Sequence, residues 1–505
     1  MKPKILVKHT RIEISNYEMG DCSSLEYMFS VWDPVYHCSL FKGLDYNEET
    51  KTLYLPRGMD IQYLEDIFCT NAVVDKNNDE YENIDPIPIK YLTRDDMQKQ
   101  AIKFTLGVDE YKYTKSKSQL SVNLGTGKGK TFVAVATICF SGSRTIIITN
   151  SIDWLKQWKE KILEYTPLDE KEIYMITGSN TIDKLLCRDP LKYKIFLASH
   201  ATIKSYGDTN GWDAIDNLFK YIKVGLKIYD EAHLYFDNLC KIDYHSNTKR
   251  TLYLTATPAR SNRDENVIYQ IYFKNIPSIE LFNKQQDAHT NYWAIFYNTH
   301  PQPIDIQNCR GAYGFAPNQY PKYVVNRPNF LYLLFILIDM TLNIPGKVLI
   351  YIGTNAAIKE VYEYLITQFP FLKNCIGIYT SLIKENKSEQ LKNKFILSTT
   401  KSAGTASDIP DLSVVINIAE PFASKVLAQQ TFGRLRGYDT LYIDIIDTGF
   451  YATKNYYKSK KSVYQKYALR FKESVMRDDE LHNRGESIIN KYEKKKLMFT
   501  PIFKN

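Results

Sequence analysis

The chain has 505 residues, 44% of them apolar, and a net charge of +8 at pH 7, so it can bury several cores and we expect about three domains. Its longest apolar run is far shorter than the roughly 20 residues that cross a bilayer, the N-terminus lacks a signal-peptide pattern, and the eight cysteines include no C-x-x-C pair. These features argue against a membrane, secreted or zinc protein, and we expect a cytoplasmic one, in the host cytoplasm if the chain is viral, with no membrane partner.

Residues 1–89 predict a small α+β accessory domain. We expect strands over residues 5–8, 11–14 and 52–55, and helices over 22–29 and 61–68. The segment holds eight Lys and Arg against sixteen Asp and Glu, a balance of −8. Such an acidic domain is better suited to binding a replication or recombination protein, or to recognising the shape of a nucleic-acid junction, than to binding along a phosphate backbone.

A β-prone run ends at Leu124 in a glycine-rich loop that closes on Gly-Lys-Thr and opens a helix over residues 130–140. Glycines let backbone N–H groups approach phosphate oxygens, and the helix N-terminus attracts the anion. We expect Lys130 to reach the β- and γ-phosphates and the Thr131 hydroxyl to bind Mg²⁺. Leu124 replaces the first glycine of the strict motif. The other predicted loop residues are Gly125, Thr126, Gly127, Lys128 and Gly129.

A second strand, over residues 224–229, delivers the tetrapeptide Asp-Glu-Ala-His about a hundred residues later. Beside a phosphate loop, Asp230 is placed to hold Mg²⁺ through water, and Glu231 to orient the water that attacks the γ-phosphate. A further strand over 251–254 ends in Thr-Ala-Thr-Pro. The sequence therefore predicts ATP and Mg²⁺ as cofactors.

Between these motifs, apolar strands alternate with helices, which predicts α/β lobes with parallel sheets covered on both faces. We expect an ATP-binding lobe over 90–285, a proline-containing linker over 286–326 and a second lobe over 327–450. First-lobe elements are strands over 145–149, 173–177, 194–198, 226–229 and 251–254 and a helix over 152–165; second-lobe elements are strands over 347–352, 375–379, 395–398, 414–418 and 441–446 and helices over 330–338, 356–369 and 424–436.

The C-terminal extension, residues 451–505, holds fourteen Lys and Arg against six Asp and Glu, a balance of +8. We predict a basic helical segment in which lysines neutralise phosphates and tyrosines stack on bases. A solvated helix face is the alternative. The residues in question are Lys458–Lys461, Lys494–Lys496, Tyr456, Tyr457, Tyr464 and Tyr467.

The order of these motifs resembles that of superfamily 2 helicases and translocases, which have two RecA-like lobes, a DEAH-type box at residues 230–233 and a Thr-Ala-Thr box at 255–257. Residues 404–410 and 430–436 are similar to the family's fifth and sixth motifs. The resemblance implies that Arg434 reaches the γ-phosphate across a cleft, as an arginine finger. Arg436 is a second candidate for the same role. It further implies roles in adenine and nucleotide binding or catalysis for Arg94, Gln98, Asp408 and Gln430, and coupling roles for His233, Thr255 and Thr257.

The same resemblance nominates small polar side chains as contacts to nucleic-acid backbones, where they can hydrogen-bond phosphates without reading bases. Each of them has a helix cap or a strand end as its alternative role. The nominated residues are Asn150, Gln157, Ser199, Thr202, Thr354, Thr380, Gly404 and Thr405.

The accessory domain together with Leu124 is similar to the phage branch-migration helicases of the UvsW type. We therefore expect an ATP-dependent DNA helicase or translocase that remodels or branch-migrates DNA in recombination or replication-fork repair, with branched DNA or single-strand/duplex junctions as its partner. Three alternatives remain: an RNA-directed or transcription-release motor, a restriction-type motor subunit, and a nucleic-acid-binding scaffold without catalysis.

Overall fold

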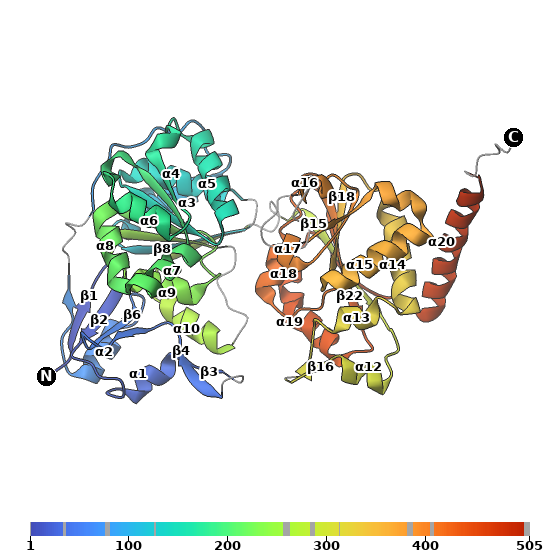
Figure 1. Ribbon diagram of the computed structural model, residues 1–505, viewed down its shortest axis with the longest axis horizontal. Helices are drawn as coiled ribbons and strands as arrows, with labels where there is room; N and C mark the ends of the chain where they lie inside the picture. The colour runs from blue at the N-terminus through green and yellow to red at the C-terminus, as the bar shows by residue number, and fades with distance from the viewer. Residues whose placement is uncertain are drawn as a thin grey trace. The chain divides into compact units, whose positions relative to one another are not determined.

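The computed structural model describes residues 2–33, 37–75, 81–125, 128–255, 263–282, 288–312, 314–380, 387–403 and 409–498. The chain divides into two compact units, Met1–Phe282 and Asn283–Asn505, coloured blue to green and yellow to red in Figure 1. Each unit contains one seven-stranded parallel sheet, so the predicted α/β class with two doubly wound lobes is confirmed. Among the described residues, no helix has the length and apolar character needed to span a membrane.

The first-unit sheet has the strand order β10-β11-β9-β12-β13-β8-β14, and every pairing in it is parallel. Its strands are β8 (Gln119–Leu124), β9 (Thr145–Thr149), β10 (Ile173–Ile176), β11 (Ile195–Ser199), β12 (Leu226–Tyr229), β13 (Arg250–Thr255) and β14 (Ser278–Leu281). Alternate side chains of β9 enter different cores, Ile147 one and Ile146 and Ile148 the other. This explains why the strand is apolar throughout and not alternating: both faces are buried.

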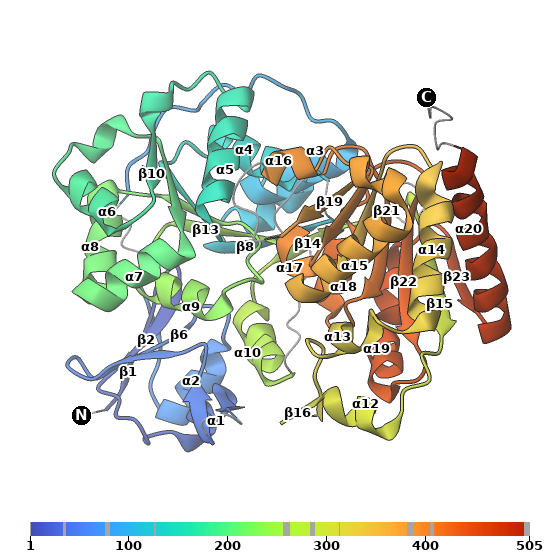
Figure 2. The ribbon, with the colours of Figure 1, turned by 45° about the vertical axis from the view of Figure 1, so that its right-hand side comes forward.

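Helices cover both faces of this sheet, as Figure 2 shows. One face packs against α3 (Asp96–Leu106), α4 (Lys130–Ser141) and α5 (Ile152–Tyr165). The other packs against α6 (Ser179–Leu186), α7 (His200–Asn210), α8 (Trp212–Ile222), α9 (Phe236–Tyr244) and α10 (Arg263–Phe273). The short 3-10 turns are Asp109–Thr114, Glu170–Glu172 and Pro190–Lys192.

The N-terminal segment forms a mixed five-stranded sheet in the order β5-β6-β2-β1-β7. Its elements are β1 (Lys4–Val7), β2 (Arg11–Ser15), β5 (Asp45–Asn47), β6 (Thr52–Pro56), β7 (Val73–Val74), α1 (Ser23–Met28) and α2 (Ile61–Phe68), with a hairpin of β3 (Ser30–Asp33) and β4 (Cys38–Phe41). Buried Ile12 and Leu64 belong to the same hydrophobic core as Tyr253 and Tyr272 of the first lobe. The accessory sheet therefore shares a core with the lobe; Figure 1 shows it beside α8 and α9.

The second-unit sheet has the order β19-β20-β18-β21-β22-β15-β23 and is also parallel throughout. Its strands are β15 (Thr290–Tyr297), β18 (Lys347–Ile352), β19 (Ile376–Tyr379), β20 (Phe395–Ser398), β21 (Leu412–Ala419), β22 (Thr440–Asp447) and β23 (Phe471–Val475). The linker prediction for 286–326 is wrong over residues 290–297, because β15 lies between β22 and β23 in this sheet. The prolines from residue 301 onward indicated irregular structure, but the strand lies before the first of them.

The helices of the second unit also lie on both sheet faces. They are α12 (Pro303–Asn308), α13 (Tyr320–Val324), α14 (Pro328–Leu342), α15 (Asn355–Gln368), α16 (Lys387–Gln390), α17 (Thr400–Ala403), α18 (Lys425–Phe432), α19 (Tyr451–Tyr467) and α20 (Asp478–Met498), with a 3-10 turn at Pro370–Asn374 and a small β16 (Arg310–Gly311) and β17 (Gly314–Phe315) ribbon. The predicted helix over 424–436 ends four residues early. Arg434 and Arg436 therefore follow α18 and do not lie on it. The C-terminal extension is not helical throughout, since β23 extends the sheet.

Candidate nucleotide site

The phosphate loop joins β8 to α4, as the sequence predicts. Gly129 precedes the first residue of α4 and has a φ of +83°, a conformation that other residues rarely adopt. A Cβ atom on Gly129 would also lie only 2.1 Å from Nε2 of Gln98. The positive φ therefore favours glycine at 129, and any larger side chain would also displace the amide of Gln98. The backbone N–H of Lys128 donates to the Gly125 carbonyl at 3.3 Å, while Thr126 and Gly127 lie outside the described residues.

The ammonium of Lys130 contacts Oε1 of Glu231 at 2.7 Å. Lys130 begins α4 and Glu231 follows β12, and their side chains are only 11% and 16% exposed. Because the carboxyl ends of parallel strands meet at one sheet edge, two motifs a hundred residues apart converge there. The structure thus places the predicted cation and acid in direct contact.

Asp230 is held by a tryptophan of α5 that lies outside the nucleotide motifs. The indole Nε1–H of Trp158 on α5 donates to Oδ2 of Asp230 at 2.8 Å, and the Asp230 backbone N–H donates to the Ile148 carbonyl at 3.0 Å. Burial and the neighbouring Glu231 charge raise the pKa of Asp230 to about 6, while Lys130 and the indole act in the opposite direction. A buried indole needs an acceptor, and the Asp230 carboxylate supplies it.

The last residue of the DEAH-type box, His233, contacts the end of β13. Nδ1 of His233 lies 2.9 Å from Oγ1 of Thr255 and 3.4 Å from Oε2 of Glu231, and the histidine is 1% exposed. Glu231 itself has a φ of +51°, which non-glycine residues seldom adopt. His233 and Thr255 therefore lie within the same cluster as the acid, whereas Thr257 lies outside the described residues.

Gln98 bridges α3 and the phosphate loop. Its Oε1 accepts from the Arg94 backbone N–H at 2.9 Å, and its Nε2 faces the Lys128 carbonyl at 3.5 Å. Asp95 caps α3 by accepting from the Gln98 backbone N–H at 2.9 Å. The exposed Arg94 guanidinium pairs with Asp95 at 3.0 Å. The structure thus joins the predicted adenine-side segment to the loop.

Two of the nominated nucleic-acid contacts, Ser199 and Thr354, act as helix caps. Ser199 accepts from the Thr202 backbone N–H at 3.1 Å and caps α7, and Thr354 accepts from the Ala357 N–H at 3.3 Å and caps α15. The buried side-chain N and O of Asn150, just after β9, have no hydrogen-bond partner in the described part of the chain. Gln157 is exposed on α5, Thr380 is buried after β19, and Gly404 and Thr405 lie outside the described residues.

In the second unit, Arg434 lies near Tyr351 of β18, where its charge opposes the burial that raises the pKa of that tyrosine. The Glu420 carboxylate accepts from the Thr400 backbone N–H at 2.7 Å, and burial raises its pKa. Gln430 is 9% exposed on α18 and Arg436 is exposed. Asp408 lies outside the described residues.

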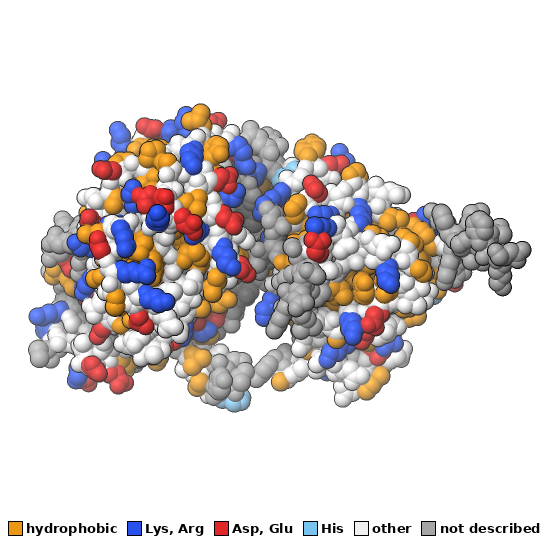
Figure 3. Space-filling view, turned by 45° about the horizontal axis from the view of Figure 1, so that its top comes forward, with side chains coloured by type: hydrophobic (Ala, Val, Ile, Leu, Met, Phe, Trp, Pro, Cys, Tyr) orange, Lys and Arg blue, Asp and Glu red, His pale blue; other side chains and the backbone are white. Residues whose placement is uncertain are grey.

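The predicted nucleic-acid role of the extension is wrong for several of its residues. Lys460 is 3% exposed and its Nζ lies 2.9 Å from Oδ2 of Asp444, so it belongs to a buried ion pair. Tyr464 is fully buried and stacks on Tyr292 with ring centroids 4.1 Å apart, and Tyr457 is 4% exposed. On the face in Figure 3, Lys and Arg side chains are interspersed with Asp and Glu over the described surface.

The family described as "Type III restriction enzyme, res subunit" matches residues 92–260, which contain the phosphate loop and the acidic box. The matched segment makes up most of the first lobe. The match covers the cluster around Lys130, so the superfamily 2 resemblance found in the sequence is supported for this lobe.

Three curated proteins that are similar to this chain are named as helicases. Identity is 28% over 145 residues to putative DNA 3'-5' helicase Rad25 of Haloarcula marismortui (29% of this chain, 21% of the relative), and 28% over 150 residues to DNA 3'-5' helicase XPB of Mycobacterium tuberculosis (30% and 25%). It is 22% over 331 residues to the general transcription and DNA repair factor IIH helicase/translocase subunit XPB of Danio rerio (62% and 39%). The matches span about a fifth to two fifths of these relatives.

Solved structures share the fold of this chain. A fragment of a putative HsdR subunit of a type I restriction enzyme from Vibrio vulnificus has a TM-score of 0.52 at 17% identity (78% of this chain, 70% of that chain), and S. cerevisiae Dbp5 bound to RNA and ADP BeF3 has 0.50 at 15% (78% and 92%). T4 UvsW has 0.36 at 15%, covering 94% and 100%. The first two structures show the fold alone, because their identities to this chain are low. The narrower resemblance to UvsW-type enzymes stays a prediction.

Proposed function

We propose that this chain is an ATP-dependent DNA helicase or translocase. The observation that carries the proposal is the contact of the Lys130 ammonium with Glu231 at the edge of the sheet where β8 and β12 end, with Asp230 beside it. A cation, two adjacent carboxylates and a glycine-rich helix start are the parts that triphosphate hydrolysis requires. The names of the curated relatives support DNA as the substrate.

The residues present fit a Mg²⁺–nucleotide. Asp230 and Thr131 offer the hard oxygen ligands that Mg²⁺ prefers, and the raised pKa of Asp230 reflects a carboxylate that a nearby positive charge would stabilise. When bound, Mg²⁺ supplies charge neutralisation at the phosphate oxygens. Lys130 would hold the β- and γ-phosphates, and Gly129 keeps backbone N–H groups within reach of them.

Hydrolysis then needs a positioned water. Glu231 orients that water and accepts its proton as the water oxygen bonds to the γ-phosphorus, while the bond to the β-phosphate oxygen breaks and ADP leaves. Arg434 stabilises the charge that develops on the γ-phosphate, and Arg436 is the second candidate. Nucleotide state changes the motor's geometry through contacts that differ between states, and His233 with Thr255 couples the acid to β13.

We further propose that the motor remodels or branch-migrates DNA, supported by the accessory sheet that shares its core with the first lobe. The decisive experiment measures ATPase rates of the full chain with single-stranded DNA, duplex, a four-way junction and RNA at several salt concentrations. Greatest stimulation by the junction supports remodelling. Stimulation by RNA alone would contradict the DNA assignment, and no stimulation by any nucleic acid would contradict the motor.

A restriction-type motor subunit is the second candidate, because the matched family carries that description. Affinity purification of the tagged chain from its natural source tests it. A stoichiometric nuclease or methyltransferase partner would favour this candidate, and its absence together with junction-stimulated ATPase favours the remodelling motor.

A further inference from the structure

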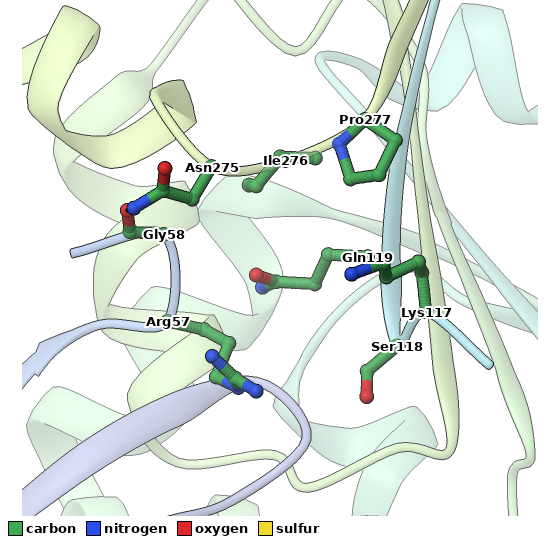
Figure 4. A pocket seen from close by; sticks show the side chains of 8 residues that line it. All are labelled: Arg57, Gly58, Lys117, Ser118, Gln119, Asn275, Ile276 and Pro277. Atoms are coloured by element: carbon green, nitrogen blue, oxygen red, sulfur yellow. The ribbon is translucent and has the colours of Figure 1, made fainter. Parts of the chain in front are cut away.

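A polar cavity of about 70 Å³ lies where the accessory sheet meets the first lobe. Arg57 and Gly58 from the turn after β6 form one wall, Lys117 and Gln119 at the start of β8 another, and Asn275 before β14 a third. Figure 4 shows the Gln119 side chain extending across the cavity toward the turn of Arg57 and Gly58. The volume is several times the roughly 10–15 Å³ that one water needs.

This cavity is separate from the nucleotide site. Gln119 begins β8, whereas the phosphate loop follows Leu124 at the other end of the same strand. At about 3.3 Å per residue, the two ends lie roughly 17 Å apart. A ligand in the cavity would therefore contact neither Lys130 nor Asp230.

The cavity carries positive charge without a carboxylate among its lining residues. Arg57 is partly buried and has no hydrogen bond or ion pair with any described residue, and burial lowers its pKa. Lys117, which is exposed, adds a second cation at the rim. A partly buried guanidinium without a partner is costly, and an anion would offset that cost.

The cavity also contains a buried acceptor whose orientation is fixed. Nε2 of Gln119 donates to the Tyr253 hydroxyl at 2.7 Å and to the Thr10 carbonyl at 3.3 Å. These bonds leave Oε1 on the other side of the amide, and this atom is buried without a hydrogen-bond partner in the described ranges. Gln119 is 4% exposed. The ligand must therefore accept hydrogen bonds from the cations and donate one to Gln119.

We propose that the cavity binds a phosphate group that retains a hydroxyl, either inorganic phosphate or the monoanion of the terminal phosphate of a nucleic-acid strand, whose second pKa is about 6. Its oxygens would accept from Arg57 and Lys117, and its P–O–H would donate to Oε1 of Gln119. An internal phosphodiester has no such hydroxyl and is excluded. The bound group would join the accessory sheet to the first lobe.

The test uses the full chain and compares phosphate with sulfate at equal ionic strength, by thermal unfolding and by titration. Sulfate has the same shape but no O–H at neutral pH. We expect phosphate to raise the unfolding temperature saturably and sulfate to do so much less. Arg57→Gln and Lys117→Gln should each weaken phosphate at least tenfold, while Lys115→Gln, an exposed charge two residues outside the cavity, should not.

A second experiment distinguishes inorganic phosphate from the terminal phosphate of a strand as the ligand. Duplexes with and without a 5'-terminal phosphate compete against inorganic phosphate, and competition only by the phosphorylated duplex identifies a strand end as the ligand. Equal competition by both duplexes, equal effects of phosphate and sulfate, or unchanged binding by Lys117→Gln would each overturn the proposal. None of these readouts needs ATP turnover, so the phosphate-site proposal can be supported or contradicted independently of the proposed motor function.

Discussion

Glu231 combines a left-handed backbone with a direct contact to Lys130, so its carboxylate is held beside the phosphate loop. Glu231→Gln keeps the size of the side chain and removes its basicity. We expect the nucleic-acid-stimulated ATPase rate to fall about 10²–10⁴-fold while ATP binding persists. Single-turnover hydrolysis and fluorescent-nucleotide binding measure the two effects. A variant that turns over normally would contradict the assigned role.

Trp158 is the residue through which the pH dependence can be tested. Its indole donates to Asp230 and lowers the pKa of that carboxyl, so Trp158→Phe should raise the pKa further above about 6. Activity that needs ionised Asp230 is lost as pH falls through this pKa. The acid limb of kcat/KM should therefore move upward by about one pH unit.

The control for this substitution is Trp154→Phe, one turn earlier on α5, which leaves the indole of Trp158 in place. Its pH profile should match that of the unaltered chain. An acid limb that stays in place in Trp158→Phe, or moves equally in both variants, would exclude a positioning role for Trp158.

At the scale of elements, α19 shows how a lysine-rich helix can be mainly structural. Lys460 pairs with Asp444, which also accepts from Asn417 at 3.0 Å and from the Tyr292 hydroxyl at 2.9 Å. Lys460→Ala leaves this acid buried without its cation and should cost about 3–5 kcal/mol of stability. Lys458→Ala, two residues away and exposed, should change stability by less than about 0.5 kcal/mol.

Urea unfolding of the two lysine variants compares these costs. DNA binding provides the second readout: if Lys458 contacts a phosphate, its loss lowers the salt slope of binding by about 0.9, and the loss of Lys460 does not. Equal destabilisation by both variants would show that the ion pair contributes nothing beyond an exposed lysine.

At the scale of the molecule, the mechanism that we propose uses residues from both units. Lys130, Asp230 and Glu231 belong to the first unit and Arg434 to the second. Arg434→Ala should leave ATP binding intact and lower hydrolysis about 10³–10⁵-fold, since a finger acts on the transition state. Arg436→Ala is the comparison, and equal losses would mean that both arginines act. Unchanged hydrolysis in Arg434→Ala would exclude its role as the finger.

The order and type of most elements could be predicted from the sequence because strands buried on both faces are apolar throughout and the nucleotide motifs mark strand ends. Local signals placed β9, β18, β20 and α5 at their observed bounds. They missed β15 and β23, since strand membership depends on pairing with distant segments such as β22. They also placed Arg434 on a helix that ends before it.

By itself, the sequence determined the two α/β lobes, the phosphate loop and the acid that follows β12, because glycine geometry, periodicity and charge are local properties. Only the tertiary structure decided which partner each polar group has. The indole of Trp158 donates to Asp230, Lys460 is buried on Asp444, and the Arg57 cavity opens where the accessory sheet joins the lobe. Burial and hydrogen bonding depend on segments far apart in the chain, and no local pattern encodes those contacts.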